Sequence, residues 1–191
     1  MLSSIEGMLD VQSRLGPIDA ELWGATADSR EAAEGILFAA IPGARFDGHD
    51  FLPAALASGS PAVLLQADPA NFDWPKDRVA LQVPDARRAL AIAAHELEGR
   101  PSATMRCIGL TGTNGKTSTV GILRSVLAAA GLSGGSLGTT GIDWTEGGRA
   151  VHHDATHTTP EGPQLFGWLA KMRDAGVEAV AMELSSHALA Q

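Results

Sequence analysis

The sequence predicts an α/β protein built from a small N-terminal α/β domain, residues 1–101, followed by the first part of a second α/β domain, residues 102–191. Two observations predict this class. Short apolar runs bounded by Gly, Pro and Asp alternate with longer amphipathic segments. The stretch "GRPS" at residues 99–102 reads as a helix end followed by a turn, and we take it as the boundary. With 191 residues, 45% of them hydrophobic, the chain can bury a core.

The first domain contains three apolar runs that predict strands, at residues 35–41, 61–66 and 79–83. Residues 50–59 predict a short helix that begins at Asp50 and ends on a glycine, and residues 85–99 predict a longer helix capped by Asp85. The apolar stripe expected on the longer helix consists of Ala86, Leu90, Ala93, Ala94 and Leu97.

The second domain begins with a predicted strand at 105–110, a glycine-rich loop and a helix at 116–131. Short strands joined by a glycine turn follow in 134–154, and then a helix within 158–176 and an apolar run at 177–184 that is typical of a buried parallel strand. The expected apolar face of the first helix is Ile122, Leu123, Val126, Leu127 and Ala130, and that of the second is Leu165, Trp168, Leu169 and Met172. About three strands are too few for a complete doubly wound domain, so we expect a piece of a longer enzyme.

Composition excludes several classes of protein. The net charge of −8 and the pI near 5.1 argue against a nucleic-acid-binding protein. The single cysteine, Cys107, excludes an internal disulfide and a cysteine-rich zinc site, and we expect it to be a small buried strand residue. The first ten residues show no secretory signal and no run is long enough to span a membrane, so we expect a cytoplasmic protein.

The stretch "GLTGTNGKTST", residues 109–119, predicts a phosphate-binding loop. The general pattern is G-x-x-x-x-G-K-[ST], and Gly115, Lys116 and Thr117 supply its second half. The glycines of the first half stand at Gly109 and Gly112, so the loop is a variant of the pattern. Glycines allow backbone N–H groups to approach phosphates, the following helix adds its positive N-terminal end, Lys116 can reach phosphate oxygens, and Thr117 can bind Mg²⁺.

Glu183 ends the apolar run, at the strand end where ligands of open α/β sheets collect. Its carboxylate is expensive to bury without a partner, and Mg²⁺ is a suitable one. The hydroxyls of Ser185 and Ser186 can equally hold a ligand or cap a helix. A loose group of three histidines with Asp154 is weak evidence for a metal site. These histidines are His152, His153 and His157.

Three stretches together resemble the Mur ligase family: "TGTNGKT", "TTPE" and "AMELSSHAL". The last is most similar to the MurE members, which are UDP-N-acetylmuramoyl-tripeptide synthetases. The segment "ADSREAAEGILFAAIPGARFDGHDFLPAALASGSPAVLL", residues 27–65, resembles the N-terminal domain of the same members. The resemblance covers nearly the whole chain in the right order, and it is more selective in "MELSSHAL" than in the phosphate loop.

The resemblance implies an ATP- and Mg²⁺-dependent ligase of peptidoglycan synthesis, and with it a role in cell-wall formation, cell shape and division. The γ-phosphate of ATP would pass to the D-glutamate carboxylate of UDP-MurNAc-L-Ala-D-Glu, and the amine of meso-diaminopimelate or L-lysine would displace phosphate from the acyl phosphate. The first domain would bind the UDP-muramoyl peptide, and the second would begin the ATP-binding domain. We expect a monomer without nucleic-acid or membrane partners.

The resemblance also assigns site residues. Lys116 would be catalytic, and Thr117 and Glu183 would bind Mg²⁺. The ATP phosphates would contact Gly112, Thr113, Asn114, Gly115, Lys116, Thr117 and Ser118. The UDP-muramoyl peptide would contact Ser29, Ala44, Arg45, Phe46, Thr158, Thr159, Ser185 and Gln191. Asp28 and Arg30, on either side of Ser29, can instead serve structure by pairing with each other.

The chain also departs from the family. His157 stands where some members have asparagine, which puts its role in doubt. The family's second histidine motif, carbamylated lysine and C-terminal domain are missing, so we expect no ligase activity from these 191 residues and no indication of the diamino acid. Three rival functions remain: another Mur or folylpolyglutamate-type ligase, a non-catalytic nucleotide- or UDP-sugar-binding module, and a P-loop kinase.

Overall fold

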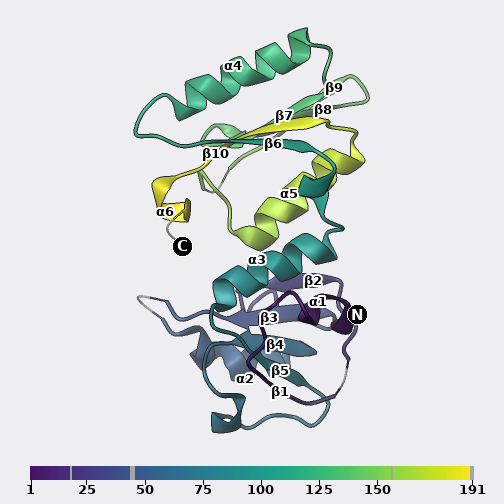
Figure 1. Ribbon diagram of the computed structural model, residues 1–191, viewed down its shortest axis with the longest axis vertical. Coiled ribbons are helices and arrows are strands. Elements are labelled where there is room, and N and C mark those ends of the chain that lie inside the picture. The colour runs from purple at the N-terminus through teal and green to yellow at the C-terminus, as the bar shows by residue number, and fades with distance from the viewer. Residues whose placement is uncertain (18, 44–45, 156, 190–191) are drawn as a thin grey trace. The chain divides into compact units, whose positions relative to one another are not determined.

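The computed structural model describes residues 1–17, 19–43, 46–155 and 157–189. The chain divides into two compact units, Met1–Glu98 and Gly99–Gln191 (Figure 1). Both are mixed α/β, as the alternation of apolar runs and amphipathic segments predicts.

Unit 1, Met1–Glu98, is built on a sheet with the strand order β1-β5-β4-β3-β2. Strands β2 to β5 pair in parallel, and β1 pairs antiparallel with β5. Its elements are α1 (Ser3–Glu6), β1 (Ser13–Leu15), β2 (Gly24–Thr26), β3 (Ile36–Ala40), the 3-10 turn η1 (Gly48–Phe51), α2 (Leu52–Ala57), β4 (Ala62–Leu65), the 3-10 turn η2 (Pro69–Asn71), β5 (Val79–Gln82) and α3 (Ala86–Leu97).

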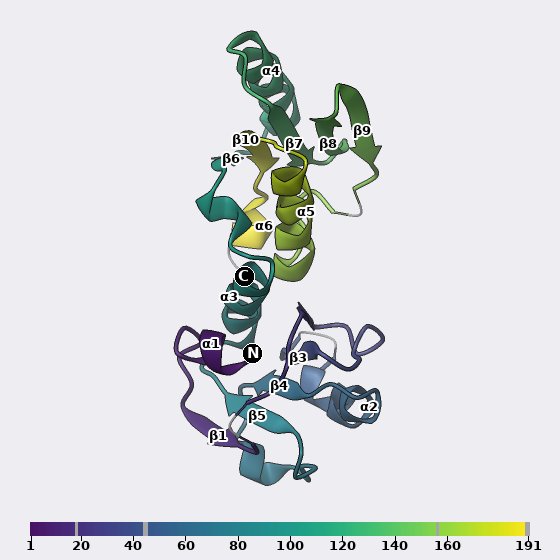
Figure 2. The ribbon, with the colours of Figure 1, turned by 90° about the vertical axis from the view of Figure 1, so that its right-hand side faces the viewer.

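Both faces of this sheet are covered, which explains why its strands β3, β4 and β5 are almost wholly apolar. Alternate strand residues point to opposite faces. Leu37 of β3 and Leu64 of β4 pack with α1 and α3, whereas Phe38 and Val63 pack with α2. The helices on the two sides of the sheet can be followed in Figure 2.

The two predicted helices of unit 1 have different outcomes. Asp85 caps α3, as predicted, by accepting a hydrogen bond from the Arg88 N–H at 2.9 Å. The predicted cap at Asp50 is wrong. The chain first forms the 3-10 turn η1, which Asp47 caps through the His49 N–H at 3.0 Å, and α2 then begins at Leu52 without a side-chain cap.

Unit 2, Gly99–Gln191, is built on a sheet with the strand order β6-β10-β7-β8-β9. Strand β10 pairs in parallel with β6 and with β7, and β7, β8 and β9 form an antiparallel meander. Its elements are the 3-10 turn η3 (Pro101–Ala103), β6 (Arg106–Leu110), α4 (Lys116–Ala129), β7 (Gly134–Gly138), β8 (Gly141–Glu146), β9 (Arg149–His153), α5 (Gly162–Asp174), β10 (Ala179–Glu183) and α6 (Ser186–Leu189).

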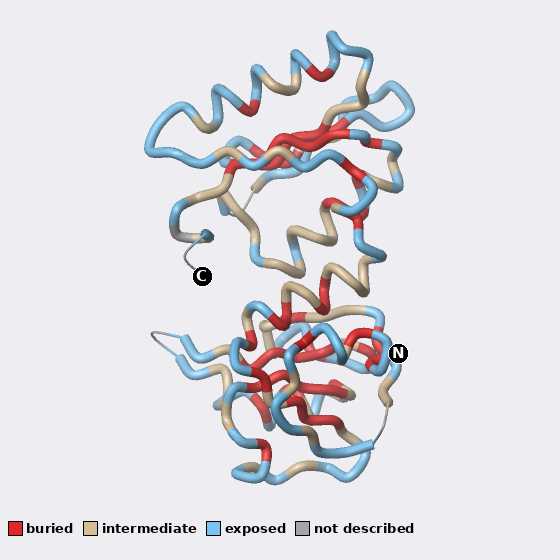
Figure 3. Tube along the Cα trace, viewed as in Figure 1, coloured by how far each residue is buried: buried red, intermediate tan, exposed pale blue. Residues whose placement is uncertain are grey.

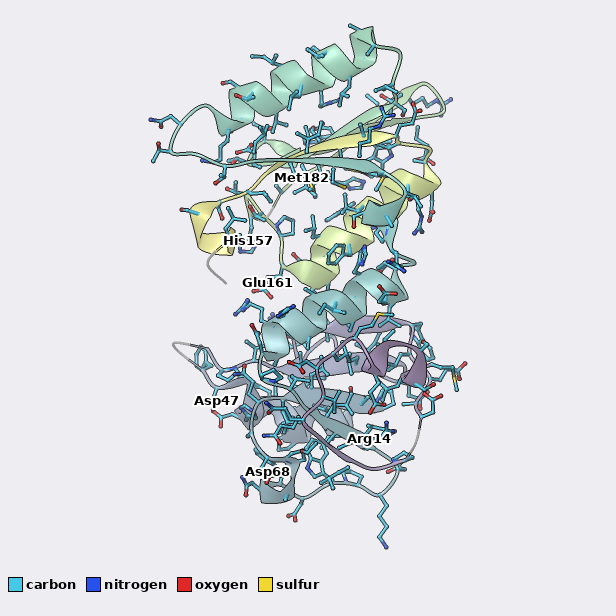
Figure 4. The ribbon with its side chains drawn as sticks, viewed as in Figure 1. Arg14, Asp47, Asp68, His157, Glu161 and Met182 are labelled. Atoms are coloured by element: carbon cyan, nitrogen blue, oxygen red, sulfur yellow. The ribbon has the colours of Figure 1, made fainter. Side chains whose placement is uncertain are left out.

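Helices α4 and α5 cover opposite faces of this sheet (Figures 1 and 2). The predicted face of α5 is confirmed, because Leu165, Trp168, Leu169 and Met172 all pack in the core with β7 and β10. Met182 of β10 lies in the same core and is labelled in Figure 4.

Two burial predictions for unit 2 are wrong. Helix α4 buries Val120 and Leu127, whereas Ile122 and Val126 are 63% and 55% exposed. The helix therefore meets the sheet along a narrower and rotated face. Cys107 is exposed because β6 stands at the end of the strand order, where it pairs with β10 on one side (Figure 3).

Candidate functional site

The phosphate-binding loop and Glu183 lie at the same edge of the unit 2 sheet. Strands β6 and β10 run parallel, and their register pairs Leu110 with Glu183. The Leu184 N–H donates to the Leu110 carbonyl at 2.8 Å, so the two chains remain together beyond the strands. Strand β7 ends at the same edge with Gly138, since its Leu137 pairs with Met182 of β10. Three strands thus bring their carboxyl ends to one place, where ligands of open α/β sheets bind.

The loop between β6 and α4 has the backbone that phosphate binding needs. Gly112 and Gly115 have positive φ angles, 148° and 81°, which favour glycine. Because Gly115 has no side chain, α4 begins without a side-chain cap, and the first N–H groups of the helix are available to an anion. The Lys116 Nζ donates to the Gly112 carbonyl at 2.7 Å. The lysine therefore folds over the loop and brings a positive charge to it.

Glu183 is a buried carboxylate, 1% exposed. Its Oε1 accepts from the Thr139 N–H at 3.0 Å, and its Oε2 accepts from the Thr139 hydroxyl at 3.2 Å. These two donors are neutral, so they stabilise the carboxylate without neutralising it. A hard divalent cation suits such an oxygen ligand. The Glu183 carboxylate thus fits Mg²⁺ as one of its ligands.

The threonines that precede α5 join the same network. Thr159 donates its hydroxyl to the Glu183 carbonyl at 2.9 Å and accepts from the Ser185 N–H at 3.0 Å. The Thr158 and Thr139 hydroxyls lie 3.1 Å apart. The Ser185 hydroxyl accepts from the Ala188 N–H at 3.1 Å, which makes it a cap of the short α6. Four of the predicted residues, Glu183, Thr158, Thr159 and Ser185, therefore meet around the end of β10.

The histidine group does not form one site. His152 and His153 are neighbours on β9 and point to opposite faces. His152 contacts Asp143 at 2.9 Å and Asp154 at 3.5 Å, whereas His153 stacks on Trp144 with ring centroids 5.3 Å apart. His157 lies on the segment before α5 (Figure 4). Within the residues that the structure describes, no group of three His, Cys, Asp or Glu side chains could hold a metal ion.

In unit 1, the predicted substrate residues follow parallel strands. Ser29 is in the turn after β2 and is half-buried, and Phe46, which follows β3, is 71% exposed. The open question about Asp28 and Arg30 is answered in part, because their side chains do pair, with Arg30 Nε 2.9 and 3.0 Å from the two Asp28 oxygens. Hydrogen bonds from Arg30 hold the pKa of Asp28 at about 2. Ala44, Arg45 and Gln191 lie outside the described residues.

Sequence reasoning missed His49. Its Nδ1 contacts the Asp47 carboxylate at 2.6 Å, and its Nε2 lies 3.4 Å from the N–H of Ala67, which follows β4. The ring also stacks on Phe72, with centroids 5.9 Å apart. His49 thus connects the segment after β3, which contains Phe46, to the residues that follow β4. Its partner Asp47 is labelled in Figure 4. The signal was present in "DGHDF", where histidine follows a turn-forming Asp-Gly pair.

Comparison with known proteins places both units in one family. Residues 22–97 match the Mur ligase family catalytic domain, and residues 110–191 match the Mur ligase middle domain. The chain is 43% identical over 173 residues to the UDP-N-acetylmuramyl-tripeptide synthetase of Deinococcus radiodurans, covering 90% of this chain and 34% of that protein. It is 44% identical over 173 residues to the UDP-N-acetylmuramoyl-L-alanyl-D-glutamate--2,6-diaminopimelate ligase of Xanthomonas campestris, covering 91% and 34%.

Solved structures agree on the fold. A UDP-N-acetylmuramoyl-L-alanyl-D-glutamate--2,6-diaminopimelate ligase superposes with a TM-score of 0.70 at 24% identity, covering 91% of this chain and 35% of that one. MurF ligase from Thermotoga maritima in complex with ADP superposes with a TM-score of 0.54 at 23% identity, covering 85% and 32%. The chain spans about a third of the length of the curated relatives it matches. None of the helices that the structure describes is long and apolar enough to cross a bilayer. On the two domain matches and on relatives that cover nine tenths of it, the chain belongs to the Mur ligase family.

Proposed function

We propose that this chain forms the UDP-muramoyl-peptide-binding and ATP-phosphate-binding parts of an ATP-dependent acid–amino-acid ligase of peptidoglycan synthesis. In the complete reaction, a D-glutamate carboxylate oxygen of UDP-MurNAc-L-Ala-D-Glu attacks the γ-phosphorus of ATP, and ADP leaves. The amine of a diamino acid then attacks the acyl carbon, loses a proton and displaces inorganic phosphate. Because the reaction consumes ATP, we propose that the protein acts in the cytoplasm.

One observation carries the ATP half of this proposal: a glycine loop with a folded-over lysine begins where β6 ends, beside the buried carboxylate that ends β10. Phosphoryl transfer depends on positioning and on neutralising charge. Lys116 and the N–H groups at the start of α4 would neutralise phosphate oxygens. Thr117 and Glu183 would hold Mg²⁺, which supplies a further positive charge at the phosphates when it is bound.

The substrate half rests on the clustered hydroxyls and on the relatives. Thr158, Thr159 and Ser185 surround the end of β10, beside the residues proposed for ATP. Ser29 and Phe46 follow neighbouring parallel strands of unit 1, and we propose that they contact the uridine end. The Xanthomonas relative is named for 2,6-diaminopimelate, whereas the Deinococcus relative is named without an amino acid, so both diaminopimelate and lysine remain candidates.

Titration calorimetry of the 191-residue chain with UDP-MurNAc-L-Ala-D-Glu tests the substrate half, after circular dichroism shows that the chain is folded. We expect saturable binding that Ser29→Ala weakens. Ser58→Ala is the matched control, because Ser58 is an exposed residue at the end of α2, at the opposite end of the strands. A folded chain that binds no UDP-sugar contradicts the assignment of unit 1.

Titration with ATP and Mg²⁺ tests the ATP half separately. Lys116→Ala removes the charge that neutralises the phosphates, and we expect binding to weaken by about tenfold or more. Lys76→Ala, on an exposed loop of unit 1, is the control. Binding that survives Lys116→Ala unchanged rules out the loop as the ATP site. In a longer protein, phosphate release that requires both the UDP-sugar and the amino acid separates a ligase from a kinase.

A further inference from the structure

Thr139 contacts the Glu183 carboxylate twice. It lies in the two-residue turn between β7 and β8, whose register pairs Gly138 with Gly141. Its N–H donates to Oε1 at 3.0 Å and its hydroxyl to Oε2 at 3.2 Å, so one residue holds both oxygens of the carboxylate. Because Glu183 is 1% exposed, these bonds stand in for much of the hydration that burial removes.

Gly138, the residue before this turn, leaves room for the carboxylate. A Cβ placed on Gly138 would lie 2.3 Å from Glu183 Oε1 and 2.7 Å from its Cδ, far inside contact distance. Any side chain at this position would push Glu183 away from the N–H of Thr139. The missing side chain at Gly138 and the two donors of Thr139 together define the position of the Glu183 carboxylate.

The direction of the hydrogen bonds follows from counting protons. The Thr139 hydroxyl lies 3.2 Å from Glu183 Oε2 and 3.1 Å from the Thr158 hydroxyl, and it has one proton to donate. A carboxylate that binds a divalent cation must be ionised, as the proposed function requires of Glu183, and an ionised carboxylate only accepts hydrogen bonds. Thr139 therefore donates to Glu183 and accepts from Thr158. The Thr158 hydroxyl proton is then used in the hydrogen bond to Thr139. The Thr158 oxygen can therefore only accept hydrogen bonds from other groups.

We propose that Thr139 is a positioning residue of this site: it fixes the Glu183 carboxylate for a divalent cation and turns the Thr158 hydroxyl into a hydrogen-bond acceptor toward the substrate. The inference rests on the proposed function. Each carboxylate oxygen has about two lone-pair sites and Thr139 uses one on each, so both oxygens retain a site for the cation. Thr158 then meets an N–H or O–H group of the muramoyl peptide rather than a carboxylate.

Mn²⁺ binding to the 191-residue chain in the presence of ATP, followed by electron paramagnetic resonance, tests the first part. Thr139→Val keeps the shape and the N–H but removes the hydroxyl, and groups that orient a metal ligand typically change metal affinity by about tenfold or more. We expect that loss in Thr139→Val, and wild-type affinity in Thr139→Ser, which restores the hydroxyl. Thr145→Val, on the exposed part of β8, is the control. Wild-type affinity in Thr139→Val overturns the proposal.

Carbon-13 NMR of glutamate-labelled chain, without nucleotide, separates this inference from the proposed function. We expect the Glu183 carboxyl resonance to move in Thr139→Val and to stay in place in Thr139→Ser and Thr145→Val. An unmoved resonance in Thr139→Val overturns the positioning role whether or not ATP binds. If the wild-type chain binds no Mn²⁺ and ATP while the resonance does move, the proposed function fails and the hold of Thr139 on Glu183 stands.

Discussion

The two units bury their parallel strands to different degrees. In unit 1, β3 and β4 are buried along almost their whole length, with helices on both faces. In unit 2, β10 is buried throughout, but β6, which leads into the phosphate-binding loop, is mostly exposed (Figure 3). Two properties of β6 go with its exposure. Its sequence, RCIGL, is less apolar than that of β3 or β4, since it begins with Arg106. It also stands at the end of its strand order.

The helices repeat this contrast. Helix α3 of unit 1 buries five residues, among them Leu90 and Ala93, whereas α4 of unit 2, which is two residues longer, buries Val120 and Leu127. Two of the elements that carry the proposed ATP site, β6 and α4, are therefore less buried than β3 and α3 of unit 1, whereas β10, which carries Glu183, is fully buried. Elements with few buried contacts open more readily than core strands. We therefore expect truncation of a side chain to cost more stability in the core of unit 1 than on the exposed face of α4.

The largest expected effect is a contrast in stability between two aliphatic truncations. Leu64→Ala in β4 removes a fully buried side chain and is expected to destabilise unit 1 by about 2–5 kcal/mol. Ile122→Ala in α4 removes an exposed side chain and is expected to change stability by no more than about 0.5 kcal/mol. Urea unfolding followed through the amide signals of each unit measures both changes.

The control for this contrast is Leu127→Ala, a buried residue on the same helix as Ile122. It is expected to destabilise unit 2 clearly, which would show that the method detects changes in α4. If Ile122→Ala is as damaging as Leu127→Ala, the exposed face of α4 is covered in solution, and the contrast between the units is wrong.

The sequence predicts most of the elements, because their apolar periodicity is local. For α3 it predicts four of the five buried residues, Ala86, Leu90, Ala93 and Ala94, but it misses Ala89, and the predicted Leu97 is only partly buried. It fails for α4, where Ile122 and Val126 belong to an apolar face that the sheet does not reach. Amphipathic periodicity shows that a helix has an apolar face, but not which neighbours are present to cover it.

The candidate site divides in the same way. The loop around Lys116 and the acid at Glu183 can be found from the sequence, because each follows an apolar strand directly. Thr139 cannot, since its partner Glu183 is 44 residues away and the contact exists only when β7 and β10 pair. The role of Gly138 cannot be predicted from the sequence either, because the first glycine of "GTTG" looks like any other turn residue.

A smaller effect is expected in how the stability of each unit depends on pH. In unit 2 this dependence comes from His152. A hydrogen bond to Asp143, and more weakly one to Asp154, raises the pKa of His152 above its ordinary value of 6.5. A raised folded-state pKa stabilises the β8–β9 pair fully below pH 6.5, and this stabilisation is lost as the pH rises through the folded-state pKa. We expect NMR titration to show a raised pKa that Asp143→Asn lowers toward 6.5.

Asp154→Asn is the matched control for His152, because Asp154 contributes less to the raised pKa and lies farther away, at 3.5 Å. Asp143→Asn should lower the pKa more than Asp154→Asn does. The opposite ranking would place the main partner of His152 at the end of β9 rather than on β8. The Arg124 side chain, 3.6 Å from Asp143, keeps that carboxylate paired on its other side.

The smallest effect is expected at Asp28 in unit 1. Hydrogen bonds from Arg30 lower the pKa of Asp28 from 3.8 to about 2. A lowered folded-state pKa stabilises the loop after β2 above pH 3.8, and this stabilisation is lost as the pH falls from 3.8 toward 2. The pair is largely exposed, so solvent screening keeps its contribution to stability small. Carbon-13 titration of the Asp28 carboxyl should give a pKa near 2 in the wild type and a higher pKa in Arg30→Ala, which still stays below 3.8 because the N–H of residue 30 keeps its hydrogen bond to Asp28. Arg78→Ala, which removes the partner of Asp77 elsewhere in unit 1, should leave Asp28 unchanged. An Asp28 that titrates near 3.8 in the wild type would mean that the pair does not form in solution, which would leave Arg30 free to meet the phosphates of a UDP-sugar beside Ser29.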